Sequence, residues 1–162
     1  MKRLAAALGA SMLAAPALAA CPVELAVYGD RDGAAEIDFR PVGDIPSASN
    51  AFKIILEPDI VLEGMVLWTE GDAARPTGVL HHGCPEGDAT GEELAACTVW
   101  QGVIYTVDAE GGVGLMPRQG APAPAHLVLS DLAASLAAAP ALDGGRLSRL
   151  PFDVFSIKGC QE

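Results

Sequence analysis

Basic residues are scarce in this sequence. Its 162 residues include 10 lysines and arginines against 21 aspartates and glutamates. After position 20 the basic residues stand apart from one another between Arg31 and Lys158, with Arg146 and Arg149 as the nearest neighbours. Nucleic acid is bound by clustered lysine and arginine side chains. The charge pattern therefore argues against a nucleic-acid-binding protein. A cationic partner or a metal ion is easier to accommodate, but solubility is the preferred explanation for the excess of carboxylates.

The motifs that identify common enzyme classes are missing as well. No serine stands in a Gly-x-Ser-x-Gly pattern, and no two cysteines are spaced as Cys-x-x-Cys. The first pattern marks the nucleophile of many hydrolases, and the second marks thioredoxin-like redox centres. We therefore assign no catalytic residue and expect a non-catalytic binding module for a protein or small-molecule partner. The alternative is a hydrolase that uses His81 or His82 together with nearby carboxylates.

Long apolar runs are confined to the start of the chain. Lys2 and Arg3 precede an uncharged stretch over residues 4–20, which ends in small residues. A short basic segment followed by an apolar one is the pattern of an export signal that is removed on maturation. Its removal leaves 8 basic and 21 acidic side chains, a formal charge of −13. We expect a signal peptide at residues 1–20 and a periplasmic or secreted protein.

The remaining chain is predicted to be one domain, residues 21–162. Its most hydrophobic run, residues 60–68, is short and contains Glu63. A membrane-spanning helix needs about 20 predominantly apolar residues. This run therefore belongs to a folded core or sheet, and we expect no transmembrane helix in the mature chain.

Two cleavage signals overlap at Cys21. The sequence Ala-Leu-Ala at residues 17–19 fits the small-x-small pattern of ordinary signal peptidase. The sequence Leu-Ala-Ala-Cys at residues 18–21 resembles a bacterial lipobox, and that resemblance implies a diacylglycerol on the Cys21 sulfur. A lipid anchor, and with it membrane contact, is thus the alternative to a free exported chain. Lipoproteins usually place a flexible polar tether after the anchor, whereas here residues 22–28 alternate like a strand.

The number of cysteines favours disulfides. Thiols of exported proteins tend to pair, and the mature chain holds an even set of four. An acylated Cys21 would leave three cysteines and one unpaired thiol. Four cysteines allow three connectivities, of which we favour Cys84 with Cys97 and Cys21 with Cys160. On the chain-entropy model the second bridge stabilises by about 4 to 5 kcal/mol because it closes a very long loop.

Strand-like runs dominate the chain, separated by Gly, Pro and Asp turns. Ser130 is a candidate N-cap, and Leu132 and Leu136 fall on one face of a helix that ends before Pro140. We expect an α+β domain with a mainly antiparallel sheet of about seven strands and one main helix near the C-terminus. The runs predicted as strands are 23–28, 36–42, 52–56, 60–70, 79–82, 98–108 and 152–157, with 126–129 as a further candidate.

His81 and His82 are the candidate metal ligands. They lie near Cys84 and Cys97, and imidazole and thiolate are the ligands that zinc and copper prefer. Neighbouring side chains of a strand point to opposite faces, so the two histidines share one ion only if the strand ends there. A disulfide-bonded sulfur is no longer a thiolate. We therefore expect no cofactor, with zinc or copper as the alternative.

Two further groups of residues invite a functional interpretation. Oxygen ligands for calcium are offered by Asp30, Asp32, Glu36 and Asp38. Gly33 does not stand where an EF-hand loop needs glycine, however, and a solvated hairpin tip is favoured. Trp100 and Tyr105 lie in a predicted strand, where burial is expected. If both are exposed, they form an interaction patch.

Overall fold

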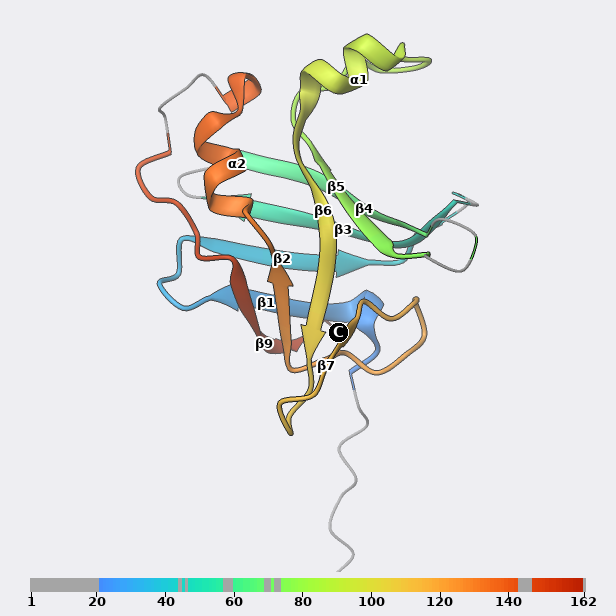
Figure 1. The fold of residues 1–162 in the computed structure, drawn as a ribbon, viewed down its shortest axis with the longest axis vertical. Coiled ribbons are helices and arrows are strands. Elements are labelled where there is room, and N and C mark those ends of the chain that lie inside the picture. The colour runs from blue at the N-terminus through green and yellow to red at the C-terminus, as the bar shows by residue number, and fades with distance from the viewer. Residues whose placement is uncertain are drawn as a thin grey trace, which may run out of the picture.

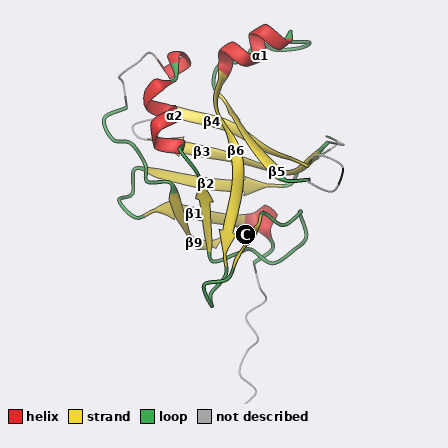
Figure 2. Cartoon of the chain, in the orientation of Figure 1, coloured by secondary structure: helices red, strands yellow, loops and turns green. Residues whose placement is uncertain are grey.

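The computed structural model describes residues 21–161, with gaps at residues 44, 46, 57–59, 69–70, 72–73 and 143–146. The predicted export signal therefore lies outside the described residues. Within them the chain forms nine strands and two α-helices, shown in Figures 1 and 2. In chain order the elements are η1 (Val23–Leu25), β1 (Ala26–Asp30), β2 (Ala35–Arg40), β3 (Ala48–Leu56), β4 (Ile60–Trp68), β5 (Pro76–His81), α1 (Gly91–Cys97), β6 (Thr98–Val107), β7 (Val113–Leu115), β8 (His126–Leu129), α2 (Leu132–Ala138), η2 (Pro140–Leu142) and β9 (Val154–Cys160).

The sheet closes into an antiparallel barrel of eight strands. The order of neighbours is β5-β4-β3-β2-β1-β9-β8-β6, and β5 pairs again with β6 to complete the ring. β7 is an additional short strand on β6. The α+β description holds broadly, but the predicted antiparallel sheet of about seven strands with one main helix is corrected to a closed barrel of eight strands with two helices. Closure removes the exposed edges that an open sheet presents to solvent.

Side chains fill the interior of the barrel. On β3 the buried positions alternate with less buried ones, so Phe52, Ile54 and Leu56 point inward. Phe52 faces Gly64 across the β3–β4 pair, and its ring lies where a side chain at position 64 would stand. An eight-stranded barrel is just wide enough for such side chains to meet at its centre. The inside of this barrel is therefore a packed core.

α2 packs its buried Leu132 and Leu136 into the same core, but its cap differs from the predicted one. The N-cap is Asp131, which has a left-handed backbone (φ 59°) and whose own side chain makes no capping hydrogen bond. The Asp153 carboxylate instead accepts hydrogen bonds from the amides of Asp131 (3.1 Å) and Ala133 (3.0 Å). Ser130 is thus not the cap, because a carboxylate distant in sequence satisfies the first amides of the helix.

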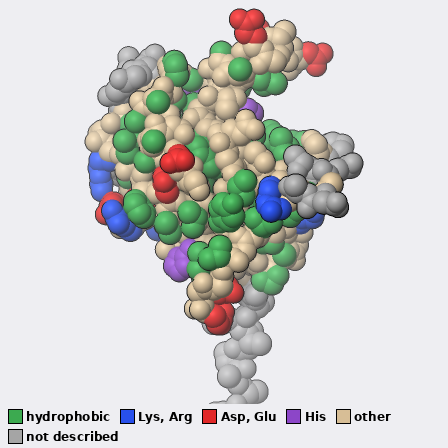
Figure 3. Space-filling model, in the orientation of Figure 1, with side chains coloured by type: hydrophobic (Ala, Val, Ile, Leu, Met, Phe, Trp, Pro, Cys, Tyr) green, Lys and Arg blue, Asp and Glu red, His purple; other side chains and the backbone are tan. Residues whose placement is uncertain are grey.

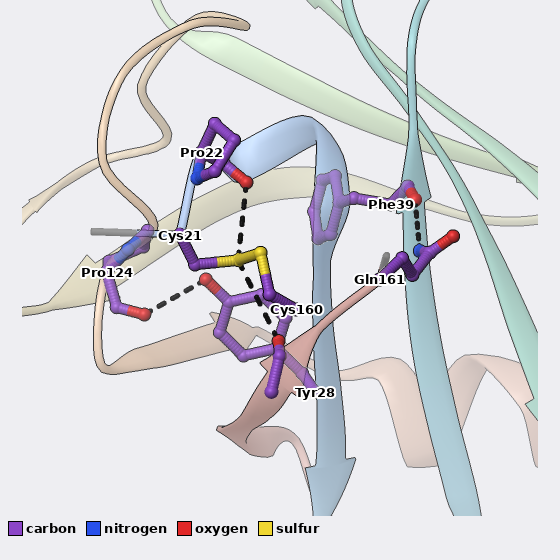
Figure 4. The surroundings of a disulfide bond; sticks show 8 residues. Cys21, Pro22, Tyr28, Phe39, Pro124, Cys160 and Gln161 are labelled. Carbon is purple, nitrogen blue, oxygen red and sulfur yellow. Dashed lines mark hydrogen bonds between the residues drawn. A yellow bond between two sulfur atoms is a disulfide. The ribbon is translucent and has the colours of Figure 1, made fainter. Parts of the chain in front are cut away.

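Both predicted disulfides are confirmed. Cys84 bonds to Cys97, and Cys21 bonds to Cys160, with Cα–Cα distances of 5.2 and 5.7 Å. Figure 4 shows the second bond beside Tyr28, whose hydroxyl donates to the Pro124 carbonyl at 2.9 Å. The bond joins the segment before β1 to the end of β9, and β1 and β9 are themselves paired in the sheet. It therefore fastens the barrel where its first and last strands meet.

Candidate functional site

The feature that stands out from the barrel is the connection between β5 and β6. Residues 83–97 leave the barrel after β5, turn through α1 and return directly into β6 (Figure 1). We call this segment the acidic arm because its charged residues, Glu86, Asp88, Glu92 and Glu93, are all acidic. In the space-filling view the arm projects from the body with red carboxylates on its outer surface (Figure 3). The arm therefore presents its carboxylates to solvent, away from the barrel.

The base of the arm is closed by two bonds. The Cys84–Cys97 disulfide joins its two sides. Next to it, the amide of His82 donates to the carbonyl of Cys97 at 2.9 Å, which extends the β5–β6 ladder by one step. Cys97 is the one buried residue of α1. The arm is thus anchored at its base, whereas the rest of its helix faces solvent.

A capping box begins α1. The hydroxyl of Thr90 accepts a hydrogen bond from the amide of Glu93 (3.3 Å), and the Glu93 carboxylate accepts from the amide of Thr90 (2.8 Å). The Thr90 hydroxyl also lies 2.8 Å from that carboxylate. These hydrogen bonds favour the charged form and lower the pKa of Glu93, with the amide as the larger cause. The spacing Thr-x-x-Glu was visible in the sequence and is the signal by which this helix start could have been found.

The capping box predicts how the arm responds to acid. Because the pKa of Glu93 is lowered in the folded state, its charged form stabilises α1 at any pH above the ordinary Glu value of 4.5. This stabilisation is lost as the pH falls through the lowered pKa. We expect Thr90→Val to raise the pKa of Glu93, because the hydroxyl interactions are gone while the amide remains. An NMR titration of the Glu93 carboxyl carbon in both proteins measures this. An unchanged pKa in the variant would show that the hydroxyl has no part in it.

A hollow of about 440 Å³ lies between the arm and the barrel. Its wall includes Ala96, the Cys97 end of the disulfide and Ala141 of η2, which are small and apolar, together with His82 and Glu93. α1 contacts η2 across it. On the exposed side of the helix, Leu94 keeps 41% of its surface accessible. The arm thus combines an apolar recess, an exposed leucine and four carboxylates.

The two candidate metal ligands are not brought together with further ligands. His81 is the last residue of β5 and half-buried, and burial lowers its pKa below the ordinary value. His82 lies just beyond the strand, and its Nδ1 is 3.3 Å from the carbonyl of Val61. Among the described residues no group of three or more His, Cys, Asp or Glu side chains is placed to hold a metal ion. Both nearby cysteines are bonded to each other, so no thiolate is available.

Of the carboxylates around the β1–β2 turn, Asp30 serves the turn itself, whereas Glu36 pairs with Lys158 at 3.2 Å. Asp30 accepts hydrogen bonds from the amides of Asp32 (3.2 Å) and Ala35 (3.0 Å). An aspartate that bonds to amides two and more residues ahead of it is a common way to fix a tight turn. This agrees with a hairpin tip rather than a calcium loop.

Trp100 and Tyr105 do not form a common patch. Trp100 is 3% exposed, and its indole donates to the carbonyl of Ser130 at 2.9 Å. Its ring fills the space over Gly78 and Gly102, where a Cβ would collide with it. Tyr105 is 39% exposed and lies beside β7, next to a hollow of about 300 Å³. Trp100 is therefore a core residue, and only Tyr105 of the two lies at the surface.

One serine lies within hydrogen-bond reach of a histidine. His126 on β8 and Ser156 on β9 are register partners, and Nδ1 of the histidine is 3.0 Å from the hydroxyl. A catalytic pair also needs a group that orients the imidazole and donors that stabilise an oxyanion. Among the described residues no carboxylate hydrogen-bonds to His126, and Ser156 is exposed on the outer face of its strand. This contact is a surface hydrogen bond and carries no catalytic assignment.

Comparisons with protein-family models, curated proteins and solved structures yield no match to this chain. Within the described part of the chain, no helix has the length and apolarity needed to span a bilayer. The function is therefore argued from the residues of the arm and of the hollow behind it.

Proposed function

We propose that this chain is an exported, non-catalytic binding protein that docks a basic segment of a partner protein against its acidic arm. The observation that carries the proposal is the position of the hollow. It lies behind α1, which bears Glu92 and Glu93, and the arm as a whole carries four carboxylates, so an apolar recess and a negative rim belong to one surface. Such a surface fits a segment in which lysines or arginines flank an apolar side chain.

The charge of the whole chain supports this partner chemistry. The mature sequence has a formal charge of −13, and the arm itself contains no basic residue. A field of one sign accelerates the encounter with an oppositely charged partner and repels a partner of like charge. A short basic segment with an apolar anchor would therefore be attracted over a distance and held by contact.

Disulfide bonding supports export as a free chain. Two disulfides are present, and such bonds persist in oxidising compartments. The sulfur of Cys21 is bonded to Cys160, and a sulfur in that bond has no valence left for a thioether-linked lipid. We therefore propose a periplasmic or secreted protein, in preference to a lipoprotein anchored at Cys21.

Binding can be tested with two variants that differ by one position. Ala96 lines the hollow, whereas the neighbouring Ala95 is exposed on the same helix and does not. We expect Ala96→Arg to weaken binding of a fluorescent peptide of alternating lysine and leucine at least about tenfold, roughly 1.4 kcal/mol. The matched Ala95→Arg adds the same charge without filling the recess and should cost clearly less. Fluorescence anisotropy at low ionic strength measures both affinities.

Controls separate docking from simple charge attraction. A peptide with glutamate in place of lysine should not bind the wild-type protein. Glu92→Gln on the arm should weaken binding more than Glu110→Gln in the β6–β7 turn, although both remove one exposed charge. Equal affinities for the two arginine variants, together with equal effects of the two glutamine variants, would refute docking at the arm.

A further inference from the structure

We propose that the Cys84–Cys97 bond is a redox switch for the arm, so that a dithiol reductant releases the arm and turns the docking surface off. This inference rests on the proposed function, because the surface that is switched is the one assigned above. Its structural basis is the weak attachment of the arm away from its base, where the disulfide lies beside the hydrogen bonds from the His82 amide to the Cys97 carbonyl (2.9 Å) and from the Thr98 hydroxyl to the Leu94 carbonyl (2.7 Å).

α1 has little to hold it in place other than its base. The helix has seven residues, and isolated helices of that length are unstable in water. Its first six residues are exposed, and Cys97 is the one that is buried. The capping box joins Thr90 to Glu93 within the arm and so does not tie it to the barrel. α1 is also held by its continuation into β6, by the hydrogen bond from the Thr98 hydroxyl to the Leu94 carbonyl (2.7 Å) and by its contact with η2. The disulfide adds the restraint that ties the other side of the arm, at Cys84, to the base of this helix.

The barrel itself does not depend on this bond. β5 and β6 pair from Thr77↔Val103 to His81↔Thr98, below the arm, and the ring closes through that pairing. Leu80, Val99 and Ile104 of these strands are part of the core. Breaking the bond thus loosens residues 83–96, while the strands on either side and the hydrogen bond from the His82 amide to the Cys97 carbonyl stay in place.

Paired backbone holds the two cysteines of the second disulfide next to each other, although Cys160 itself is exposed. β1 and β9 pair up to Ala26↔Cys160, and the carbonyl of Cys21 accepts a hydrogen bond from Ala123 at 2.8 Å. Beyond the bond, the backbone amide of Gln161 donates to the carbonyl of Leu25 at 2.7 Å. Its side-chain Nε2 donates to the carbonyl of Phe39 at 2.6 Å, as Figure 4 shows. Structure that keeps two thiols adjacent after reduction makes their disulfide harder to reduce, because the two thiols re-form the bond quickly. Cys84 has no comparable restraint, so the arm bond is expected to be reduced first.

The chemistry is a thiol–disulfide exchange with an external dithiol. Its thiolate attacks the sulfur of Cys84, the partly exposed member of the pair, and Cys97 leaves as a thiolate that takes up a proton. The second thiol of the reductant then attacks the mixed disulfide and releases Cys84 as a thiol. Two electrons and two protons pass to the chain, and the reductant becomes a disulfide.

The test follows reduction, arm order and binding in the same mature protein. Samples are equilibrated with graded ratios of reduced and oxidised dithiothreitol, alkylated, and mapped by peptide mass. We expect Cys84 and Cys97 to be modified at less reducing ratios than Cys21 and Cys160. In that state the α1 amides should lose protection from hydrogen exchange while those of β5 and β6 keep theirs. Affinity for the lysine–leucine peptide should fall at least about tenfold and return on reoxidation.

Two variants make the outcome decisive. Cys84→Ser with Cys97→Ser should bind the peptide as weakly as the reduced protein, whereas Cys21→Ser with Cys160→Ser should keep wild-type affinity when folded. Equal α1 protection in both redox states, or earlier reduction of Cys21–Cys160, overturns the switch whatever the peptide does. If the oxidised wild-type protein fails to bind the peptide, the proposed function is refuted. Reduction of the arm would then regulate no binding, and the switch would be refuted as well.

Discussion

Replacing both Cys21 and Cys160 by serine is expected to lower the free energy of unfolding by about 4 to 5 kcal/mol. The bond spans a sequence separation of 139 residues, so its loss releases a very large loop in the unfolded chain. Small domains are stable by only about 5 to 15 kcal/mol, and the loss is therefore a large part of the total. Urea unfolding of the purified mature protein, followed by tryptophan fluorescence, measures the change.

The other disulfide provides the matched comparison. Cys84 and Cys97 are 13 residues apart, and a loop of that size corresponds to at most about 3 kcal/mol. The actual loss should be smaller, since the freed arm also gains conformational freedom in the folded protein. Equal losses in the two double variants would contradict the argument from loop length. The intact mass of the wild-type exported chain, which should carry no acyl group, verifies that Cys21 is free to pair.

Phe52→Ala is expected to cost about 3 to 5 kcal/mol. The ring is buried at the centre of the barrel between Phe39, whose centroid lies 5.3 Å away, and Gly64, which has no side chain to fill the space. Truncation leaves a cavity that the surrounding strands cannot easily close. The change is again measured as the free energy of unfolding in urea.

Ile55→Ala on the same strand is the control. Ile55 points outward and is 38% exposed, so its truncation should cost less than about 1 kcal/mol. A similar loss for both variants would mean that the interior of the barrel is no better packed than its surface. Phe52→Leu should recover part of the stability, because it restores apolar volume next to Gly64.

The sequence predicted local elements better than their assembly. Alternating apolar residues identified most strands, and cysteine parity identified both disulfides. The residues at 23–25 were predicted as the start of a strand but form the 3-10 helix η1. Barrel closure depends on the β5–β6 and β1–β9 pairings, and alternation within a strand carries no information about its neighbours.

The candidate site was only partly predictable for a similar reason. The acidic segment between Cys84 and Cys97 was recognisable, but the hollow behind it also needs Ala141 of η2, which lies far along the chain. α1 was missed because seven residues are too few to show helical periodicity. The Asp153 cap of α2 is a long-range contact of the same kind.

The Cys21–Cys160 bond makes residues 21–160 a covalent ring. A pull applied to the chain outside these two residues passes through the sulfur atoms and does not load the hydrogen bonds between strands. A single proteolytic cut in any loop, including the arm, opens the ring without producing two separate fragments. The barrel is thereby protected from mechanical extension and from loss of pieces after nicking.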